Sequence, residues 1–384
     1  MHQRVSESAH DTSVLTLRDQ RLIAALQCDG RLSAERAAEV LGENPRTVHR
    51  RWRALMGDGT VKVVAVPVRP DSVGALFLRI KVLKGKLDAL TAALAARPDI
   101  PFIDLSASGD EITAVSLTEP GSRDQLVFRQ LPATSAVASV SAATVLHVFS
   151  EASDWRHDVL TTEERAALTP TPAHPKPRHS TRNHPAPDRP KPGHSARDHP
   201  ASDHPTPSHP TPSHPTPSHS TRDRPAPDRP APGRPAVPPG DGSDPVDSDI
   251  LAALEEDART PAAAIAARSG HPASTVRRRL ARLMSDGRLS TQVVVDPKRL
   301  GLLIDANVMM QVPPDHLDTV GRTLARHPAV HGAFATSGAT NLHVAVWVRD
   351  LAALYRLITQ DLTGLGISGV ETVIVGHAVK RPGR

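Results

Sequence analysis

Apolar residues follow the same helical pattern in two short stretches of the chain. The stretches RTVHRRWRALMGDG (46–59) and STVRRRLARLMSDG (274–287) lie 228 positions apart. In both, apolar side chains recur every three or four residues, which is the spacing of one face of an α-helix. The matching apolar positions are Val48, Trp52, Leu55 and Met56 in the first stretch and Val276, Leu280, Leu283 and Met284 in the second. Each stretch predicts an amphipathic helix, which ends at Gly59 or at Gly287.

The repetition extends far beyond these two helices. Asp19 matches Asp247, and Gly42 matches Gly270. The segments that align are LRDQRLIAALQCDGRLSAERAAEVLG (17–42) with PVDSDILAALEEDARTPAAAIAARSG (245–270), and LDALTAALAARPDI (87–100) with LDTVGRTLARHPAV (317–330). The chain therefore contains two copies of one unit, which we call module one and module two.

Each module is expected to fold as three short helices followed by an α+β region. In module two, an apolar stripe at 250–254 predicts the first helix, Pro261–Ser269 the second, and Ser274 occupies the N-cap position of the third. A β-like run follows in each module (VKVVAVPV and LSTQVVVD), and then strand, helix, strand, turn, strand, helix and strand. That order, βαββαβ, is the ferredoxin-like pattern. The predicted fold class is α+β, with two copies of a winged-helix-like helix-turn-helix domain followed by a ferredoxin-like domain.

The domain boundaries follow from this pattern and from the position of the prolines. Most of the 37 prolines lie between Pro170 and Pro245, where aromatic residues are missing and Leu, Ile and Val are rare. Such a segment is predicted to be disordered. Its HPTPS repeat has a five-residue period, which scatters the histidines around a polyproline helix, so we expect a spacer and no metal site. The predicted domains are helix-turn-helix one (15–61), ferredoxin-like one (62–150), a Pro/His/Ser-rich linker (170–243), helix-turn-helix two (244–290) and ferredoxin-like two (291–380).

Composition narrows the functional classes. The single cysteine, Cys28, excludes an intramolecular disulfide and a cysteine metal cage. No apolar run approaches the roughly 18 residues of a membrane span, and the N-terminus has no signal-peptide core, so a cytoplasmic protein without membrane contact is expected. Nucleophile-elbow, P-loop and zinc-protease motifs are missing. We therefore expect no enzyme activity, no cofactor and no metal, while a net charge of +5 favours anionic partners.

The third helix of each module carries the candidate DNA-contacting residues. The apolar stripe claims one face for the core and leaves basic and hydroxyl side chains on the other. Guanidinium groups can bond to guanine edges or phosphates, and hydroxyl groups to phosphates. A solvated basic surface is the alternative, but its occurrence twice, each time as the third helix of a triplet, favours a helix-turn-helix. The candidates are Arg46, Thr47, His49, Arg50 and Arg53 in module one and Ser274, Thr275, Arg277, Arg278 and Arg282 in module two.

Both modules resemble the Lrp/AsnC (leucine-responsive regulator/asparagine-synthesis regulator) family of bacterial transcription factors, and in particular its tandem members. The resemblance rests on DSDILAALEEDAR, STVRRRLARLMSDG, VDPKRLG, the stretch from LDTVGRTLARHPAVHGAF to the SGATNL loop, and GVETVIV. It implies a DNA-binding domain and a sensor domain for an amino acid or related metabolite. The family's sensor loop falls on Ser337, Gly338 and Asn341. Module one departs from it with SGDEIT and a shorter connection, which leaves ligand binding by this copy open.

The resemblance also implies pairing of the sensor domains, as a homo-oligomer or as a pseudo-dimer within one chain. Dimeric helix-turn-helix proteins read two half-sites, which would explain why one chain carries two readers. Two alternatives remain. The siroheme decarboxylases resemble the same two-module architecture and are enzymes without DNA binding, and a sensor that acts only on other proteins is the third class.

Overall fold

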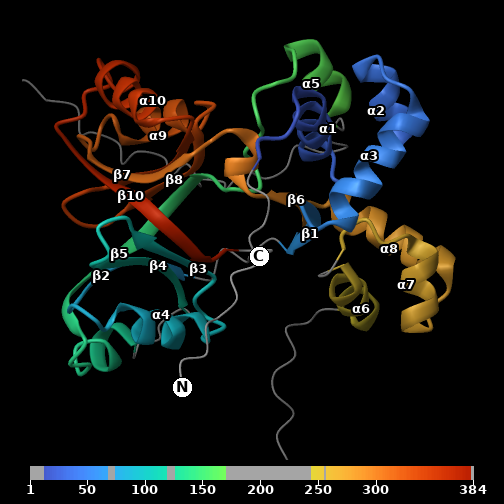
Figure 1. Ribbon diagram of the computed structural model, residues 1–384. Coiled ribbons are helices and arrows are strands. Elements are labelled where there is room, and N and C mark those ends of the chain that lie inside the picture. Colours follow the sequence, from blue (N-terminus) through green and yellow to red (C-terminus); the bar gives the residue numbers. More distant parts are fainter. Residues whose placement is uncertain (1–12, 68–73, 119–125, 170–243, 255–256, 382–384) are drawn as a thin grey trace, which may run out of the picture. The chain divides into compact units, whose positions relative to one another are not determined.

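The computed structural model describes residues 13–67, 74–118, 126–169, 244–254 and 257–381 (Figure 1). The predicted linker, 170–243, lies outside these residues. The described parts of both modules belong to one compact unit.

Each module begins with the three predicted helices. The helices are α1 (Leu17–Cys28), α2 (Ala34–Leu41) and α3 (Pro45–Gly57) in module one and α6 (Pro245–Leu254), α7 (Ala262–Ser269) and α8 (Ala273–Ser285) in module two. The Ser33 hydroxyl caps α2 by accepting a bond from the amide of Arg36 (3.1 Å). Both second helices end at a glycine in the left-handed conformation, Gly42 (φ +67°) and Gly270 (φ +74°), as the sequence predicts.

The start of the third helix in module two differs from the prediction. Pro272 occupies the N-cap position and α8 begins at Ala273, so Ser274 lies inside the first turn and the N-cap prediction is wrong. The reason is local, because proline holds φ near −58° here and has no amide hydrogen, so the helix can begin directly after it. No side chain caps α8.

The first strand of each module leaves the sensor domain and pairs with its counterpart. Strands β1 (Val61–Pro67) and β6 (Leu289–Val295) form a separate antiparallel sheet of two strands. Val64 pairs with Gln292, and these two residues are equivalent in the repeat, 228 positions apart. A pseudo-two-fold axis between the modules therefore passes through the middle of this ribbon.

The remaining strands confirm the ferredoxin-like order and close into one barrel. The strands are β2 (Gly74–Val82), β3 (Phe102–Ser106), β4 (Glu111–Thr118) and β5 (Val137–Ser150) in module one and β7 (Ile304–Gln311), β8 (Val330–Thr336), β9 (Leu342–Val348) and β10 (Gly369–Lys380) in module two. Their order is β10-β3-β4-β2-β5-β8-β9-β7. The last strand of each module pairs with the partner module, β5 with β8 and β10 with β3, so neither sheet keeps a free edge at these places.

Helices pack against the strands of each module, and side chains of the two modules meet inside the barrel. The helical elements of this part are α4 (Leu87–Ala95), α9 (Leu317–Leu324) and α10 (Leu351–Arg356), with short turns η1 (Leu126–Gln130), η2 (Pro297–Leu300) and η3 (Leu357–Asp361). Leu78 and Ile80 face the cluster beneath α4, while Val308 and Val344 face α9 and α10. On the opposite side of β2, Phe77 contacts rings of module two inside the barrel, with centroid distances of 5.5 Å to Phe334 and 4.4 Å to His343.

A helix that the repeat does not predict follows module one. Helix α5 (Thr162–Leu168) starts with a capping box, in which Thr161 and Glu164 bond each other's backbone amides (3.2 and 3.0 Å). Its Leu168 is buried in the same cluster as α1 and α2, and Glu164 pairs with Arg21 of α1. The Thr-x-x-Glu pattern was the signal that could have revealed this helix.

Candidate DNA-contacting helices and effector loop

A buried aspartate anchors the third helix of each helix-turn-helix domain. In module one, the carboxylate of Asp19 in α1 makes two contacts with the guanidinium group of Arg51 in α3. Nε of Arg51 lies 2.9 Å from Oδ1 of Asp19, and Nη2 lies 3.0 Å from Oδ2. In module two, the equivalent Asp247 of α6 lies 3.7 Å from Nη1 of Arg279 in α8. The match of Asp19 with Asp247 in the sequence is thus a structural equivalence. These pairs hold one arginine of each third helix away from the outward face.

The outward face of α8 carries the predicted residues of module two. Ser274, Arg277, Arg278 and Arg282 are exposed, Thr275 is half-buried, and the opposite face buries Val276, Leu280 and Leu283. Arg282 contacts Asp286 (Nε to Oδ2 3.3 Å). In the described part of the chain, Arg277 and Arg278 have no side-chain partner, so the first turns of α8 present two unpaired guanidinium groups.

The outward face of α3 carries the predicted residues of module one in a more constrained setting. Arg46, His49, Arg50 and Arg53 are exposed and Thr47 is half-buried. Nη2 of Arg53 lies 2.8 Å from Nε2 of His49. The Asn44 side chain caps the helix by accepting a bond from the amide of Arg46 (2.9 Å). Trp52, predicted to be a core residue, is 4% exposed and donates a hydrogen bond from Nε1 to the carbonyl of Leu22 (3.2 Å).

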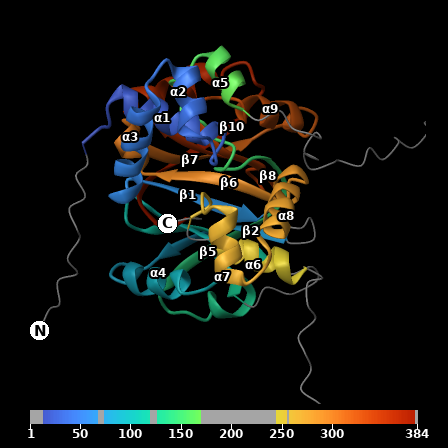
Figure 2. The ribbon, with the colours of Figure 1, turned by 90° about the vertical axis from the view of Figure 1, so that its right-hand side faces the viewer.

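The two candidate faces lie at opposite ends of the β1–β6 ribbon (Figure 2). Helix α3 leads into Val61, which pairs with the last residue of β6, and α8 leads into Leu289, which pairs with the last residue of β1. The ribbon has seven residue pairs, and a strand advances about 3.3 Å per residue, so its ends are on the order of 20 Å apart. The helices extend beyond these ends, which is compatible with two half-sites one turn of DNA apart, about 34 Å.

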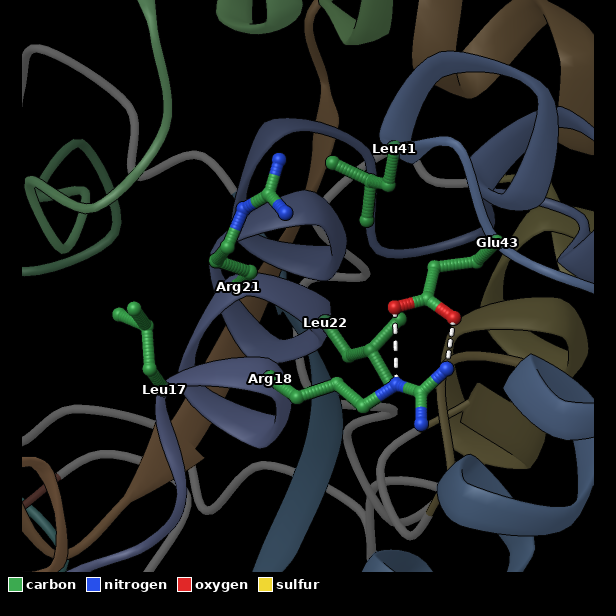
Figure 3. Close-up of a pocket in the computed structure, with 6 residues that line it drawn as sticks. All are labelled: Leu17, Arg18, Arg21, Leu22, Leu41 and Glu43. Atoms are coloured by element: carbon green, nitrogen blue, oxygen red, sulfur yellow. Dashed lines mark hydrogen bonds and ion pairs between the residues drawn. The ribbon is translucent and has the colours of Figure 1, made fainter.

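A hollow on module one lies beside the turn that leads into α3 (Figure 3). Its volume is about 230 Å³, and its lining comprises Leu17, Arg18, Arg21, Leu22, Leu41 and Glu43. Arg18 reaches across it and donates to both carboxylate oxygens of Glu43, which lowers the pKa of that carboxyl. In module two, His271, at the position of Glu43, lies 2.8 Å from Asp249, which is at the position of Arg21. This hollow therefore belongs to the bracing of the turn.

The predicted effector loop connects β8 to β9. Gly338 is exposed with φ +106°, and exposed Ser337 bonds to module one, since its amide donates to the carbonyl of Thr144 (2.8 Å) and its hydroxyl accepts from the Thr144 amide (2.9 Å). The Asn341 amide is engaged on both sides by the backbone of Val312, with Nδ2 to O at 2.8 Å and N to Oδ1 at 2.9 Å. The loop is thus held by β5 of module one and by Val312, which directly follows β7 of module two.

The corresponding loop of module one has the same length but is differently bonded. Ile103 pairs with Ala114, and Ala333 pairs with Val344, so both sides of the loop align at one offset of 230 positions. The Ser108 hydroxyl donates to Asp110, which lowers the pKa of that carboxyl. The position of Asn341 is taken by Glu111, which is buried and bonds Arg79 through Nε (2.7 Å) and Nη2 (3.0 Å). Arg79 also bonds Glu371 of module two. Module one therefore has an ion-pair network at the position where Asn341 fixes the loop of module two.

A second charged cluster lies where the last strand of module two meets module one. Arg381 bonds both Asp104 (2.8 Å) and Asp305 (2.7 Å). Burial raises the pKa of Asp104 to about 6, with the negative charge of Asp305 adding to the effect. Burial also opposes ionisation of Asp305, but the His331 ring 3.8 Å away and the charge of Arg381 outweigh it and lower the pKa of Asp305 to about 2. The two carboxyl groups therefore titrate far apart.

This cluster borders a small cavity against the ribbon. Its volume is about 70 Å³, and its lining comprises Gln27, Phe102, Ala152, Trp155, residues 292–295, His331, Trp347 and Arg381. The His331 ring stacks on Trp347 at 3.8 Å, and burial lowers the pKa of this histidine. Residues of the sensor barrel and of β6, the strand that follows helix-turn-helix two, line this cavity together.

Among the residues that the structure describes, no group of three or more His, Cys, Asp or Glu side chains is placed to hold a metal ion. Of the helices in the described ranges, none is long and apolar enough to cross a membrane.

Comparison with known proteins agrees with these features. The model of the AsnC-type helix-turn-helix domain matches residues 18–56 and 244–284, and the model of the Lrp/AsnC ligand binding domain matches residues 305–384. An uncharacterized HTH-type transcriptional regulator from Pyrococcus horikoshii is 32% identical over 139 residues, which are 36% of this chain and 88% of the relative. The HTH-type transcriptional regulator LrpA1 from Halobacterium salinarum is 37% identical over 122 residues, 32% of this chain and 84% of the relative.

A solved structure resembles both modules together. The siroheme decarboxylase NirDL aligns with a TM-score of 0.51 over 94% of this chain and 92% of its own, at 13% sequence identity. At this identity the likeness shows a shared fold and no more. The family models, in contrast, match both helix-turn-helix domains and most of the second sensor domain. The chain belongs to the Lrp/AsnC family of transcriptional regulators, and it carries two DNA-binding helix-turn-helix domains and a Lrp/AsnC ligand-binding domain.

Proposed function

We propose that this regulator reads a DNA site composed of two half-sites, one through α3 and one through α8. The observation that carries the proposal is the pair of basic helix faces at opposite ends of the β1–β6 ribbon. Arg277 and Arg278 are exposed and, within the described ranges, unpaired, so they can bond base edges or phosphates without first breaking an ion pair. The uncapped start of α8 leaves backbone amides that suit a phosphate oxygen. The residues proposed to contact DNA are Arg46, Thr47, His49, Arg50, Arg53, Ser274, Thr275, Arg277, Arg278 and Arg282.

The loop of Ser337, Gly338 and Asn341 is the proposed site for an amino-acid-like effector. Exposed backbone at Gly338 can approach the α-carboxylate or α-amino group of such a ligand closely, because no side chain intervenes. Asn341 supports the site by fixing the loop on Val312. Because Ser337 bonds Thr144 of module one, an effector here would act on the contact between β5 and β8.

We propose further that the chain acts as a regulator and not as an enzyme. The fold shared with the siroheme decarboxylase NirDL is the observation that favours the alternative. The third helices argue against it, since an enzyme that does not bind DNA has no use for exposed arginines on α8. Incubation with siroheme under reducing and oxidising conditions, followed by mass spectrometry of the tetrapyrrole, separates the two. Loss of carbon dioxide from siroheme would overturn the regulator-only proposal.

The experiment that tests DNA reading is selection of binding fragments from sheared genomic DNA, followed by fluorescence anisotropy at several salt concentrations. We expect a selected site to bind at least about 1,000-fold more tightly than a scrambled duplex, and both affinities to fall with salt. Equal affinity for the two duplexes would contradict sequence-specific reading. The effector proposal is tested by calorimetry against the common amino acids.

A further inference from the structure

Two arginines join the helix-turn-helix domains across the pseudo-two-fold axis. Arg31 donates hydrogen bonds to the backbone carbonyls of the two residues that flank Arg259, with Nη2 at 3.1 Å from the Thr260 oxygen. Arg259 lies 228 positions later and donates to the carbonyls of the two residues that flank Arg31, Gly30 (2.7 Å) and Leu32 (2.9 Å). The contact is therefore reciprocal. We call Arg31 and Arg259 the arginine clamp.

The clamp is partly buried and seated on the ribbon. Both side chains are half-buried, and burial lowers the pKa of both guanidinium groups. A Cβ on Gly30 would lie 2.5 Å from Oγ1 of Thr291 and 2.9 Å from Cγ1 of Val63, so this turn packs tightly against β1 and β6. On the other side, the amide of Ala258 donates to the carbonyl of Val63 (2.7 Å). Each turn is thus fixed to the other module and to the ribbon at once.

Trp52 connects the clamp to the third helix of module one. The guanidinium carbon of Arg259 lies 5.3 Å from the centroid of the Trp52 ring, within the range of a cation–π contact. The same position in module two is Leu280, which offers Arg31 no aromatic ring. The irregular tryptophan of α3 therefore contacts the other helix-turn-helix domain through Arg259, in addition to packing in its own core.

We propose that Arg31 and Arg259, with Trp52 beneath Arg259, are positioning residues that fix the separation of α3 and α8 and thereby select the spacing between half-sites. A ribbon of two strands is marginal by itself and twists readily, so a second set of contacts is needed to hold two domains at one separation. A fixed separation raises the effective concentration of the second reader at one half-site spacing and excludes others. The inference rests on the proposed DNA reading.

The test uses the full chain with Arg31→Gln and Arg259→Gln together. The matched control removes two charges from exposed residues of the sensor part, Arg326→Gln and Arg349→Gln. Each protein is titrated with duplexes that carry two selected half-sites at centre spacings changed in single base-pair steps, and with a duplex that carries one half-site. For the wild type and the control, a shift of half a helical turn should cost at least about tenfold in affinity, because the second half-site then faces away.

The clamp variant should keep its affinity for one half-site within about twofold but lose most of the spacing preference, down to a ratio of about three between best and worst spacing. Trp52→Leu, which copies Leu280, should fall between. An unchanged spacing profile in the clamp variant overturns the inference. A wild type that fails to bind the single half-site contradicts the proposed DNA reading instead.

A measurement without DNA keeps the two claims separate. Spin labels at Ala54→Cys and Ala281→Cys, in a chain with Cys28→Ala, report the distance between α3 and α8. The clamp variant should convert a narrow distance distribution into one at least about twice as wide, since the ribbon alone then links the readers. Distributions of equal width in the wild type and the clamp variant overturn the positioning role, whether or not DNA binds. Circular dichroism of each variant verifies that the helices are retained.

Discussion

The two helix-turn-helix domains share one plan but are braced to different degrees. In module one, Asp19 receives two close contacts from Arg51, Asn44 caps α3, and α5 adds Leu168 to the core. In module two, Asp247 is shared by Arg279 (3.7 Å) and Arg288 (3.4 Å), and no side chain caps α8. The more irregular third helix is thus the more firmly held one. Module two presents the freer basic surface, which is why we expect it to be the stronger reader of sequence.

The sensor domains differ in a comparable way at equivalent barrel positions. Asp104 on β3 occupies the position that Phe334 occupies on β8. Glu111 and Asn341 are equivalent as well, and the first belongs to an ion-pair network that spans both modules. Module one therefore supplies buried carboxylates, Asp104 and Glu111, that pair with arginines at the contact with module two. The loop of module two instead lies near the surface.

The largest expected effect comes from Asp104, whose charge has no counterpart at Phe334. Its pKa is raised to about 6 in the folded chain, so the folded state holds a proton that the unfolded state releases above about pH 4. Stability from this group is therefore lost as pH rises from about 4 to 6. Asp104→Asn should gain up to about 3 kcal/mol relative to wild type over that window. Denaturant unfolding at pH 4.5 and 7.5 measures the change.

The exposed Asp315→Asn is the control for that measurement. The effect of pH on the stability that Asp305 contributes has the opposite sign. The pKa of Asp305 is lowered to about 2, so the stability contributed by its ionised form is lost only as pH falls below about 4. A stability difference between Asp104→Asn and wild type that stays constant from pH 4.5 to 7.5 would rule out titration of Asp104 in this window.

The next effect separates the two anchoring aspartates. Asp19→Ala should lower the free energy of unfolding by about 2–3 kcal/mol and Asp247→Ala by about 1 kcal/mol, since both aspartates are buried but the contacts of Asp19 are closer. Thermal and urea unfolding of the full chain provide the values. Equal losses at both positions would remove the difference in bracing that we draw from the structure.

A smaller effect on stability is expected at the effector loop. Asn341→Ala removes two hydrogen bonds to Val312 and should cost about 1–2 kcal/mol, while abolishing any stability shift produced by an effector. Asn341→Asp keeps the acceptor but loses the donor and should retain part of the response. Calorimetry with the effector checks both. A full ligand response in Asn341→Ala would place the effector elsewhere, with the cavity beside Trp347 as the next place to search.

The sequence was informative where structure depends on local periodicity. The apolar stripes located α3 and α8 and their outward faces, and the repeat identified Asp19 and Asp247 as equivalents. The start of α8 was misplaced because a helical stripe does not show whether Pro272 or Ser274 ends the preceding turn. Helix α5 lies outside the repeat, so the repeat does not predict it, although its capping box is visible in the sequence.

The family resemblance implied pairing of the sensor domains, but the strands that join the modules were beyond prediction for a different reason. Pairing of β1 with β6, and closure of the barrel through β5 and β10, depend on strand edges that meet only after both modules have folded. Arg31 and Arg259 carry no pattern that separates them from surface arginines. The engagement of Asn341 by Val312 likewise joins residues 29 positions apart in sequence, which no local motif specifies.

The central claim is that α8 reads sequence and α3 does so more weakly. The most direct test is fluorescence anisotropy of Arg278→Ala, Arg50→Ala and the remote Arg326→Ala on a selected operator and a scrambled duplex, at two salt concentrations. Arg278→Ala should lose about 1–3 kcal/mol on the operator, with relaxed preference at one base pair, and less on the scrambled duplex. Arg50→Ala should lose less, and Arg326→Ala almost nothing. No loss for Arg278→Ala on the operator, or equal loss on both duplexes, would contradict α8 as the reader of sequence.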